Sequence, residues 1–169
     1  MDMQTVELAY HPTAKDLTAG LLARRKVSPA GRRGLWLMAA MPVFAALITA
    51  IDLPRGRFEV FPTVMLPVLA VLLFFTPHLQ ARSLAKVAAR NGLYRATVDE
   101  SGVTTAHDGA TTMVRWAAQS RFRETKDVFV MLSDDKNATC FSVLPKRGMQ
   151  NEESLDTLRA ILDRNLTRL

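Results

Sequence analysis

The chain has 169 residues, of which 49% are hydrophobic, and it carries a formal net charge of +6. Residues 1–95 hold 12 Lys or Arg against 5 Asp or Glu, whereas residues 96–169 hold 10 against 11. A nucleic-acid-binding domain concentrates its basic charge on its folded surface, so this distribution excludes nucleic acid as an expected partner. Cys140 is the only cysteine, which excludes an intrachain disulfide, and its apolar surroundings in the sequence predict that it is buried.

Residues 1–34 are predicted to form a strand and an amphipathic helix on the cytoplasmic side of a membrane. Apolar and polar residues alternate over Gln4–Tyr10, which is typical of a short strand. Thr13 and Asp16 have the spacing of a capping box, and the helix is expected to reach about Lys26. Because acidic, basic and Pro-Gly-rich sequence precedes the first apolar segment, we expect no secretory signal peptide and a retained anchor.

Two uncharged apolar segments follow, at residues 35–51 and 60–76, and the polar turn Asp52–Glu59 separates them. Each segment has 17 residues, which as a helix spans about 25 Å, close to the lower limit for crossing a bilayer. The pattern predicts a transmembrane helical hairpin over residues 35–76. A soluble protein in which both segments are core helices remains the alternative.

The flanks of the two segments predict their orientation, because cytoplasmic flanks are enriched in Lys and Arg. The basic residues before the first segment and after the second are Arg24, Arg25, Lys26, Arg32, Arg33, Arg82, Lys86, Arg90 and Arg95. The turn has only Arg55 and Arg57. We therefore expect a multi-pass protein of the cell (plasma) membrane with both termini in the cytoplasm.

Residues 77–92 are predicted to form a basic linker helix that begins after Pro77 and stops at Gly92. Three cations repeat at i, i+4 and i+8, so they share one helix face: Arg82, Lys86 and Arg90. This stripe can contact anionic headgroups, at about 1 kcal/mol for each residue. A solvated helix face is an equally good interpretation.

Residues 93–169 are predicted to form one small α+β domain. Through about Leu144, period-two alternation separated by turn residues indicates about six short antiparallel strands. Apolar residues at helical spacing over Glu152–Leu166, with Asn151 as the N-cap, indicate a closing helix. A twisted antiparallel sheet covered by one C-terminal helix is the expected arrangement.

Four short motifs carry a family resemblance: Val98-Asp99-Glu100-Ser101-Gly102-Val103, Val114-Arg115-Trp116, the run from Phe122 to Val130, and Val143-Leu144-Pro145-Lys146-Arg147-Gly148-Met149. With the order of elements, they make the chain resemble the YcxB-like family of bacterial membrane proteins. Its sheet domain is similar to bacterial pleckstrin-homology-like (PH-like) domains. The resemblance implies an α+β membrane protein with a PH-like domain at residues 93–169, no defined catalytic activity, and a role as a membrane-tethered binding or regulatory module.

No catalytic, cofactor or metal site is predicted, so we do not expect an enzyme. His11, His78 and His107 lie far apart, and no phosphate-binding loop, nucleophile elbow or paired-cysteine motif occurs. The apolar segments contain no charge, which argues against an ion or proton pathway. Two alternatives stay open: an accessory subunit of a small transporter or channel, and an enzyme without a recognisable motif.

The candidate binding surface of the sheet domain consists of four cations: Arg121, Arg123, Lys146 and Arg147. Near a bilayer they can contact anionic membrane lipid. Replacing Lys146 and Arg147 is then expected to weaken lipid binding without changing thermal stability, because exposed charges contribute little to folding. The alternatives are a solvated connection, a protein partner, or a second copy of the chain in a homo-oligomer.

Overall fold

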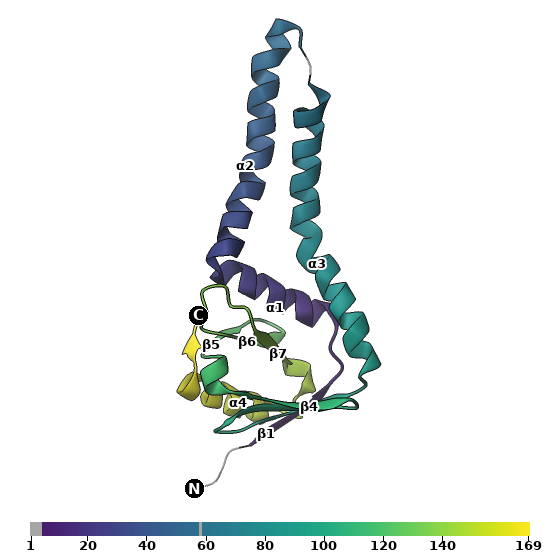
Figure 1. Ribbon diagram of the computed structural model, residues 1–169. Helices are drawn as coiled ribbons and strands as arrows, with labels where there is room; N and C mark the ends of the chain where they lie inside the picture. Colours follow the sequence, from purple (N-terminus) through teal and green to yellow (C-terminus); the bar gives the residue numbers. More distant parts are fainter. Residues whose placement is uncertain (1–4, 58) are drawn as a thin grey trace.

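The computed structural model describes residues 5–57 and 59–169, so Gln4 of the predicted strand and Phe58 of the predicted turn lie outside the described residues. A long helical hairpin stands on a small domain of sheets, and helix α1 lies across the foot of the hairpin between the two parts (Figure 1). The architecture is α+β, as predicted from the helical and strand-like spacing of apolar residues along the chain.

The N-terminal elements are strand β1 (Val6–Tyr10) and helix α1 (Ala14–Val27). The predicted capping box is confirmed: the backbone N–H of Thr13 donates to Asp16 Oδ2 at 2.8 Å, and the N–H of Asp16 donates to Thr13 Oγ1 at 3.4 Å. Ser28 then takes an extended conformation, with φ −72° and ψ 135°, because Pro29 follows it. This one residue ends α1 and caps the next helix through its hydroxyl.

The hairpin consists of helix α2 (Pro29–Asp52), the 3₁₀ turn η1 (Leu53–Arg55), the π-helical turn η2 (Phe61–Met65) and helix α3 (Leu66–Arg90). Helix α3 continues through Pro77, so the expected break and separate linker helix are wrong. Proline removes one helical hydrogen bond. Pro77 and Ala81 are nevertheless buried, and α3 packs against α1.

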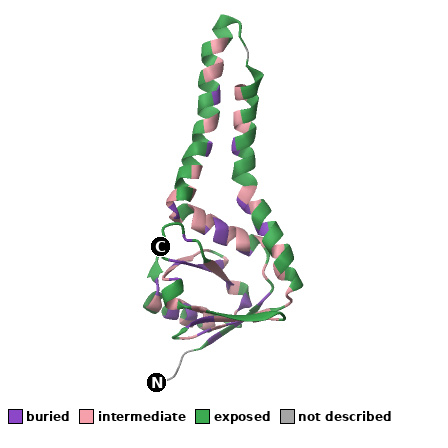
Figure 2. Cartoon of the chain, in the orientation of Figure 1, coloured by how far each residue is buried: buried purple, intermediate pink, exposed green. Residues whose placement is uncertain are grey.

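Most apolar side chains of the hairpin are exposed, including Trp36 at 78% and Phe61 at 76% (Figure 2). The two helices contact each other through small residues, Ala45 and Ala70 among them, and through a 2.9 Å hydrogen bond between the hydroxyls of Thr49 and Thr63. Both helices are long and apolar enough to cross a membrane. Only 11% of each apolar window is buried within the described residues, so the two segments are not core helices in this structure.

The six strands predicted between residues 93 and 144 are confirmed, but they lie in two sheets instead of one. The first sheet has the order β1-β2-β3-β4, with β2 (Tyr94–Val98), β3 (Gly102–His107) and β4 (Ala110–Arg115). The second has the order β7-β6-β5-β8, with β5 (Arg121–Glu124), β6 (Val128–Leu132), β7 (Phe141–Pro145) and the unexpected β8 (Thr167–Arg168). The 3₁₀ turn η3 (Trp116–Ala118) connects the two sheets.

Strand β1 pairs antiparallel with β2, so that Val6 lies opposite Val98 and Tyr10 opposite Tyr94. The whole hairpin is therefore inserted between two neighbouring strands of one sheet. Helix α4 (Glu152–Asn165) begins at the N-cap Asn151, as predicted, and closes the core between the sheets. Leu158 and Leu162 of α4 are fully buried there.

Strand β6 is buried on both faces. Phe129 and Met131 point into the core shared with the first sheet, whereas Val128, Val130 and Leu132 form a second cluster against α1. Helix α1 is thus a structural layer of the domain. Cys140 precedes β7 in a loop and is exposed, so its expected burial is wrong.

Candidate functional site

The four predicted surface cations do not gather into one free patch. Arg121 of β5 pairs with Asp134 at 3.5 Å and donates to the carbonyl oxygen of Asp135 at 3.1 Å. Lys146 and Arg147 lie in the 3₁₀ turn η4 (Lys146–Gly148), which follows β7, and both form ion pairs inside the protein. Arg123 alone of the four makes no ion pair with another described residue.

Arg147 is held by Asp16 of the capping box. Its Nη1 donates to Asp16 Oδ1 at 2.6 Å, its Nη2 donates to Asp16 Oδ2 at 2.5 Å, and Nη2 also reaches the carbonyl oxygen of His11 at 2.8 Å. Burial alone would raise the pKa of Asp16, but the hydrogen bonds from Arg147 and Thr13 outweigh burial and lower the pKa below its usual value. The pair fastens η4 to the start of α1.

Glu124, at the end of β5, accepts hydrogen bonds from three cations. Arg159 Nη2 and Lys146 Nζ donate to Oε1 at 2.8 and 2.7 Å, and Arg168 Nη2 donates to Oε2 at 2.8 Å. The hydrogen bonds from Arg159 and, after it, from Lys146 lower the pKa of Glu124 to about 2. The cluster joins η4, α4 and β8 at the end of β5, so Lys146 has a structural role.

Sequence reasoning missed both carboxylates because their partners are distant in the chain: Arg147 is 131 residues from Asp16, and Arg159 is 35 residues from Glu124. The one available signal was local, since Asp16 already stood out as the acidic member of the capping box. Contact between anionic lipid and the four cations stays a prediction, but Lys146 and Arg147 are already occupied by carboxylates.

The basic stripe of α3 is exposed, and Arg82, Lys86 and Arg90 make no ion pair with any other described residue. Because α3 is continuous with the second apolar segment, the stripe extends along the helix axis away from that segment. Arg90 lies about 12 Å farther along α3 than Arg82, which exceeds the Debye length of about 8 Å at physiological ionic strength. Headgroup contact stays a prediction, and it is best placed at Arg82.

Two cavities flank α1. The interhelical cavity, of about 400 Å³, lies between α1, α2 and α3 and is lined by both apolar residues and arginines, including Arg24, Arg25 and Met38. The strand-side cavity, of about 420 Å³, lies between α1, α3 and β7, and its lining includes Tyr10 and Tyr94. Both are open, concave and mostly apolar, and a concave apolar surface with a few polar groups is typical of a small-molecule site.

The tyrosines of the strand-side cavity are firmly placed. Their ring centroids are 6.1 Å apart, the Tyr10 hydroxyl donates to the carbonyl oxygen of Val143 at 3.2 Å, and Asn91 Nδ2 donates to the Tyr94 hydroxyl at 3.0 Å. Burial raises the pKa of Tyr10 to about 12, so this hydroxyl stays protonated at neutral pH. These groups act as packing and hydrogen-bonding elements of the junction.

Two other polar features have structural partners. His107 Nδ1 accepts a hydrogen bond from the backbone N–H of Gly109, a local bond that stabilises the turn between β3 and β4. Trp116 packs against the main core, and its Nε1 donates to the carbonyl oxygen of Glu100 at 2.9 Å. Within residues 5–57 and 59–169, no group of three or more His, Cys, Asp or Glu is arranged to hold a metal ion.

Comparison with known families identifies one part of the chain. Residues 98–162 match the family described as YcxB-like protein. The match starts at the last residue of β2 and ends within α4, so it covers most of the sheet domain and excludes the hairpin. No curated protein and no solved structure matches the chain. The part of the chain that matches this family, residues 98–162, contains the motifs on which the resemblance was based, so the resemblance is confirmed for the sheet domain.

Proposed function

We propose that this protein is an integral membrane protein whose hairpin holds a PH-like domain against the cytoplasmic face of the membrane, where the domain serves as a binding or regulatory module. The observation that carries the proposal is the insertion of the hairpin between the paired strands β1 and β2. A domain attached through one flexible linker moves freely, whereas this domain is tied to both ends of the hairpin.

Helix α1 adds a second restraint. It packs its Ala19, Ala23 and Val27 side on the outer face of the second sheet, and it also contacts both α2 and α3. The domain therefore shares one packed junction with the hairpin. This geometry suits a protein that presents a binding surface at a fixed height and orientation above a bilayer.

The PH-like assignment rests on two sheets that enclose one core and on a C-terminal helix that closes it. The membrane assignment rests on two long helices whose apolar side chains are exposed. The predicted spans, residues 35–51 and 60–76, contain no charged residue. The cytoplasmic orientation rests on the basic residues that flank these spans on the side of the sheet domain.

Insertion of the hairpin into the membrane is tested by washing membranes that contain the expressed protein with alkaline carbonate. We expect the protein to stay in the pellet, because two exposed apolar helices cannot leave the bilayer without a large hydrophobic cost. Release into the supernatant together with peripheral proteins would contradict the proposal.

The orientation is tested with Cys140, the exposed single cysteine, and a membrane-impermeant maleimide. In spheroplasts we expect labelling only after permeabilisation. The matched control combines Cys140→Ser with Arg57→Cys, which moves the thiol to the exposed turn of the hairpin, and this variant should be labelled in intact spheroplasts. The reverse pattern would place the domain outside.

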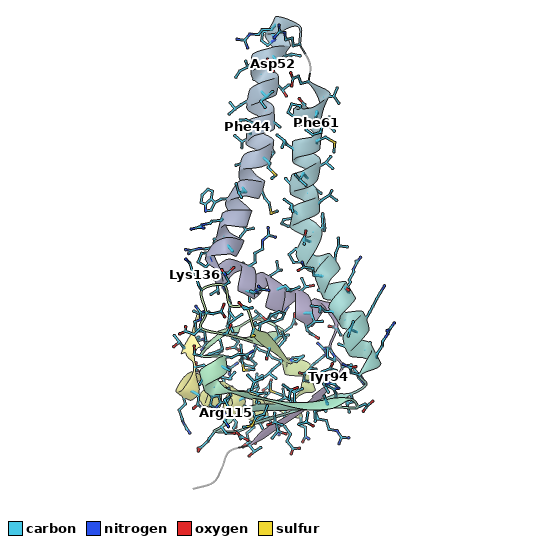
Figure 3. The ribbon with its side chains drawn as sticks, in the orientation of Figure 1. Phe44, Asp52, Phe61, Tyr94, Arg115 and Lys136 are labelled. Carbon is cyan, nitrogen blue, oxygen red and sulfur yellow. The ribbon has the colours of Figure 1, made fainter. Side chains whose placement is uncertain are left out.

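The fixed height and orientation of the sheet domain above the bilayer are tested by energy transfer from a fluorophore on the protein to acceptor lipids in nanodiscs. Lys136 lies beside the base of the hairpin, and Arg115 lies at the far side of the domain (Figure 3). With Cys140 replaced by Ser, a dye at Lys136→Cys should therefore transfer more efficiently than a dye at Arg115→Cys. Equal transfer from both positions would show a freely tumbling domain.

A further inference from the structure

The interhelical cavity has an apolar side and a cationic side. Leu37 and Met38 of α2 and Leu73 of α3 line it along the hairpin, whereas Arg24 and Arg25 line it from α1. Its volume of about 400 Å³ lies within the range of small-molecule sites, roughly 300–1,000 Å³. The cavity therefore suits a ligand that is itself amphiphilic.

The two arginines of this cavity lack an anionic partner among the described residues. Arg25 Nη2 contacts the sulfur of Met38, and a thioether is only a weak acceptor. Arg24 makes one long hydrogen bond, of 3.4 Å, to the carbonyl oxygen of Asn137. Both arginines are half-buried, so an anion placed between them would be attracted by two charges that are partly shielded from solvent.

The surrounding chain supplies no free carboxylate to pair with them. Residues 17–51 and 60–98 contain no Asp or Glu. The nearby loop contains Asp134, which pairs with Arg121, and Asp135, which accepts hydrogen bonds from Thr139. The missing negative charge is therefore most simply supplied by a ligand.

The position of the cavity along the hairpin indicates where such a ligand comes from. Trp36 neighbours the cavity-lining Leu37 and is 78% exposed, and an exposed indole beside a span favours the headgroup region. The arginines belong to α1, which lies beside the sheet domain at the foot of the hairpin (Figure 1), whereas Leu37 and Leu73 belong to the hairpin helices α2 and α3. This polarity matches that of a phospholipid in the cytoplasmic leaflet.

We propose that the interhelical cavity binds one anionic phospholipid, with its phosphate between Arg24 and Arg25 and the upper part of an acyl chain against Leu37, Met38 and Leu73. Arginine is well suited to this role because its planar fork binds phosphate oxygens in pairs. The inference rests on the proposed membrane insertion and deepens it. A lipid bound in this way would link membrane composition to the junction that fixes the domain.

The test uses the full-length protein in a mild detergent, with short-chain phosphatidylglycerol as the probe and phosphatidylcholine of the same chain length as the comparison. Native mass spectrometry and a titration measure binding. Arg25→Gln should weaken phosphatidylglycerol binding about tenfold, the effect of one lost charge-assisted hydrogen bond. The matched control, Lys26→Gln, removes the same charge from an exposed neighbour outside the cavity lining and should change binding less than about twofold.

A second variant tests the space itself. Gly34 lines the cavity, and a Cβ added there meets no atom within 4 Å, so the side chain of Gly34→Leu starts in open space. It should abolish lipid binding while the protein stays folded. Its control, Ala39→Leu, adds the same volume at an exposed position outside the cavity lining and should leave binding unchanged.

Three outcomes would overturn the lipid site. The first is equal binding of phosphatidylcholine and phosphatidylglycerol, and the second is equal loss from Arg25→Gln and Lys26→Gln, which indicates diffuse attraction. The third is a dimer that Gly34→Leu dissociates, which assigns the cavity to a second copy. Because the carbonate wash is independent of these measurements, a protein that stays in the membrane but binds no phosphatidylglycerol would contradict this inference alone.

Discussion

Arg147 and Asp16 lie 131 residues apart and form a two-pronged ion pair, with N–O distances of 2.6 and 2.5 Å. The Asp16 side chain is only 2% exposed, whereas that of Arg147 is 45% exposed. The carboxylate also caps α1 through the backbone and hydroxyl of Thr13. One buried charge therefore joins the turn after β7 to the helix at the foot of the hairpin.

Removing the guanidinium should destabilise the domain. Arg147→Gln leaves the buried carboxylate of Asp16 without its charged partner, and we expect a loss of about 2 kcal/mol in the free energy of unfolding, since Thr13 still donates to Asp16. This differs from the expectation from sequence, in which replacing Lys146 and Arg147 together leaves thermal stability unchanged. Chemical unfolding followed by tryptophan fluorescence measures the effect. Lys136→Gln, at an exposed position, is the control. An equal effect of the two substitutions would show that the ion pair does not stabilise the domain.

The acidic cluster predicts how stability depends on pH. The pKa of Glu124 is about 2 in the folded protein and about 4.3 in an unfolded chain, so its stabilising contribution is present above pH 4.3 and is lost as the pH falls toward 2. Asp16, whose pKa is also lowered, acts in the same direction. Unfolding midpoints measured from pH 6 to pH 2.5 should fall less steeply for Glu124→Gln than for the unchanged protein. Parallel curves would show that Glu124 is not coupled to folding.

Strand β1 should contribute to the stability of a domain from which it is separated by the hairpin. Leu8 is 2% exposed in the main core, so Leu8→Ala should cost about 2–4 kcal/mol. Glu7→Ala, in the same strand but exposed, should cost less than about 0.5 kcal/mol. Deleting residues 1–12 should lower the unfolding midpoint at least as much as Leu8→Ala. An unchanged midpoint after the deletion would mean that β1 does not hold the sheet together.

The contact between α1 and the second sheet can be tested at Gly20. A Cβ at this position would lie 2.6 Å from a ring carbon of Phe141 and 2.8 Å from a methyl of Val143. Gly20→Val should therefore push α1 away from β7 and cost about 1–3 kcal/mol, despite the better helix propensity of valine. At Gly34 an added Cβ meets no atom within 4 Å, so Gly34→Ala should be neutral or slightly stabilising. Thermal unfolding in detergent distinguishes the two, and equal midpoints would contradict the close packing.

Local sequence features determined the elements of this protein. The capping box at Thr13 and Asp16, the N-cap Asn151 and the alternation along β1 depend on residues within one turn or one strand, so they can be read directly from the chain. The two apolar segments are equally local, because their length and lack of charge are properties of the sequence itself. The motifs around residues 98–149 were sufficient to indicate the family.

The tertiary structure alone decided how these elements combine. The pairing of β1 with β2 spans the whole hairpin, and the division into two sheets depends on the corner at η3. Helix α3 continues through Pro77, although proline locally favours the end of a helix. The same holds for Lys146 and Arg147, which look like free surface cations in the sequence. Their carboxylate partners come from other elements, and an ion pair depends on distance in space, which neither hydrophobic period nor charge count records.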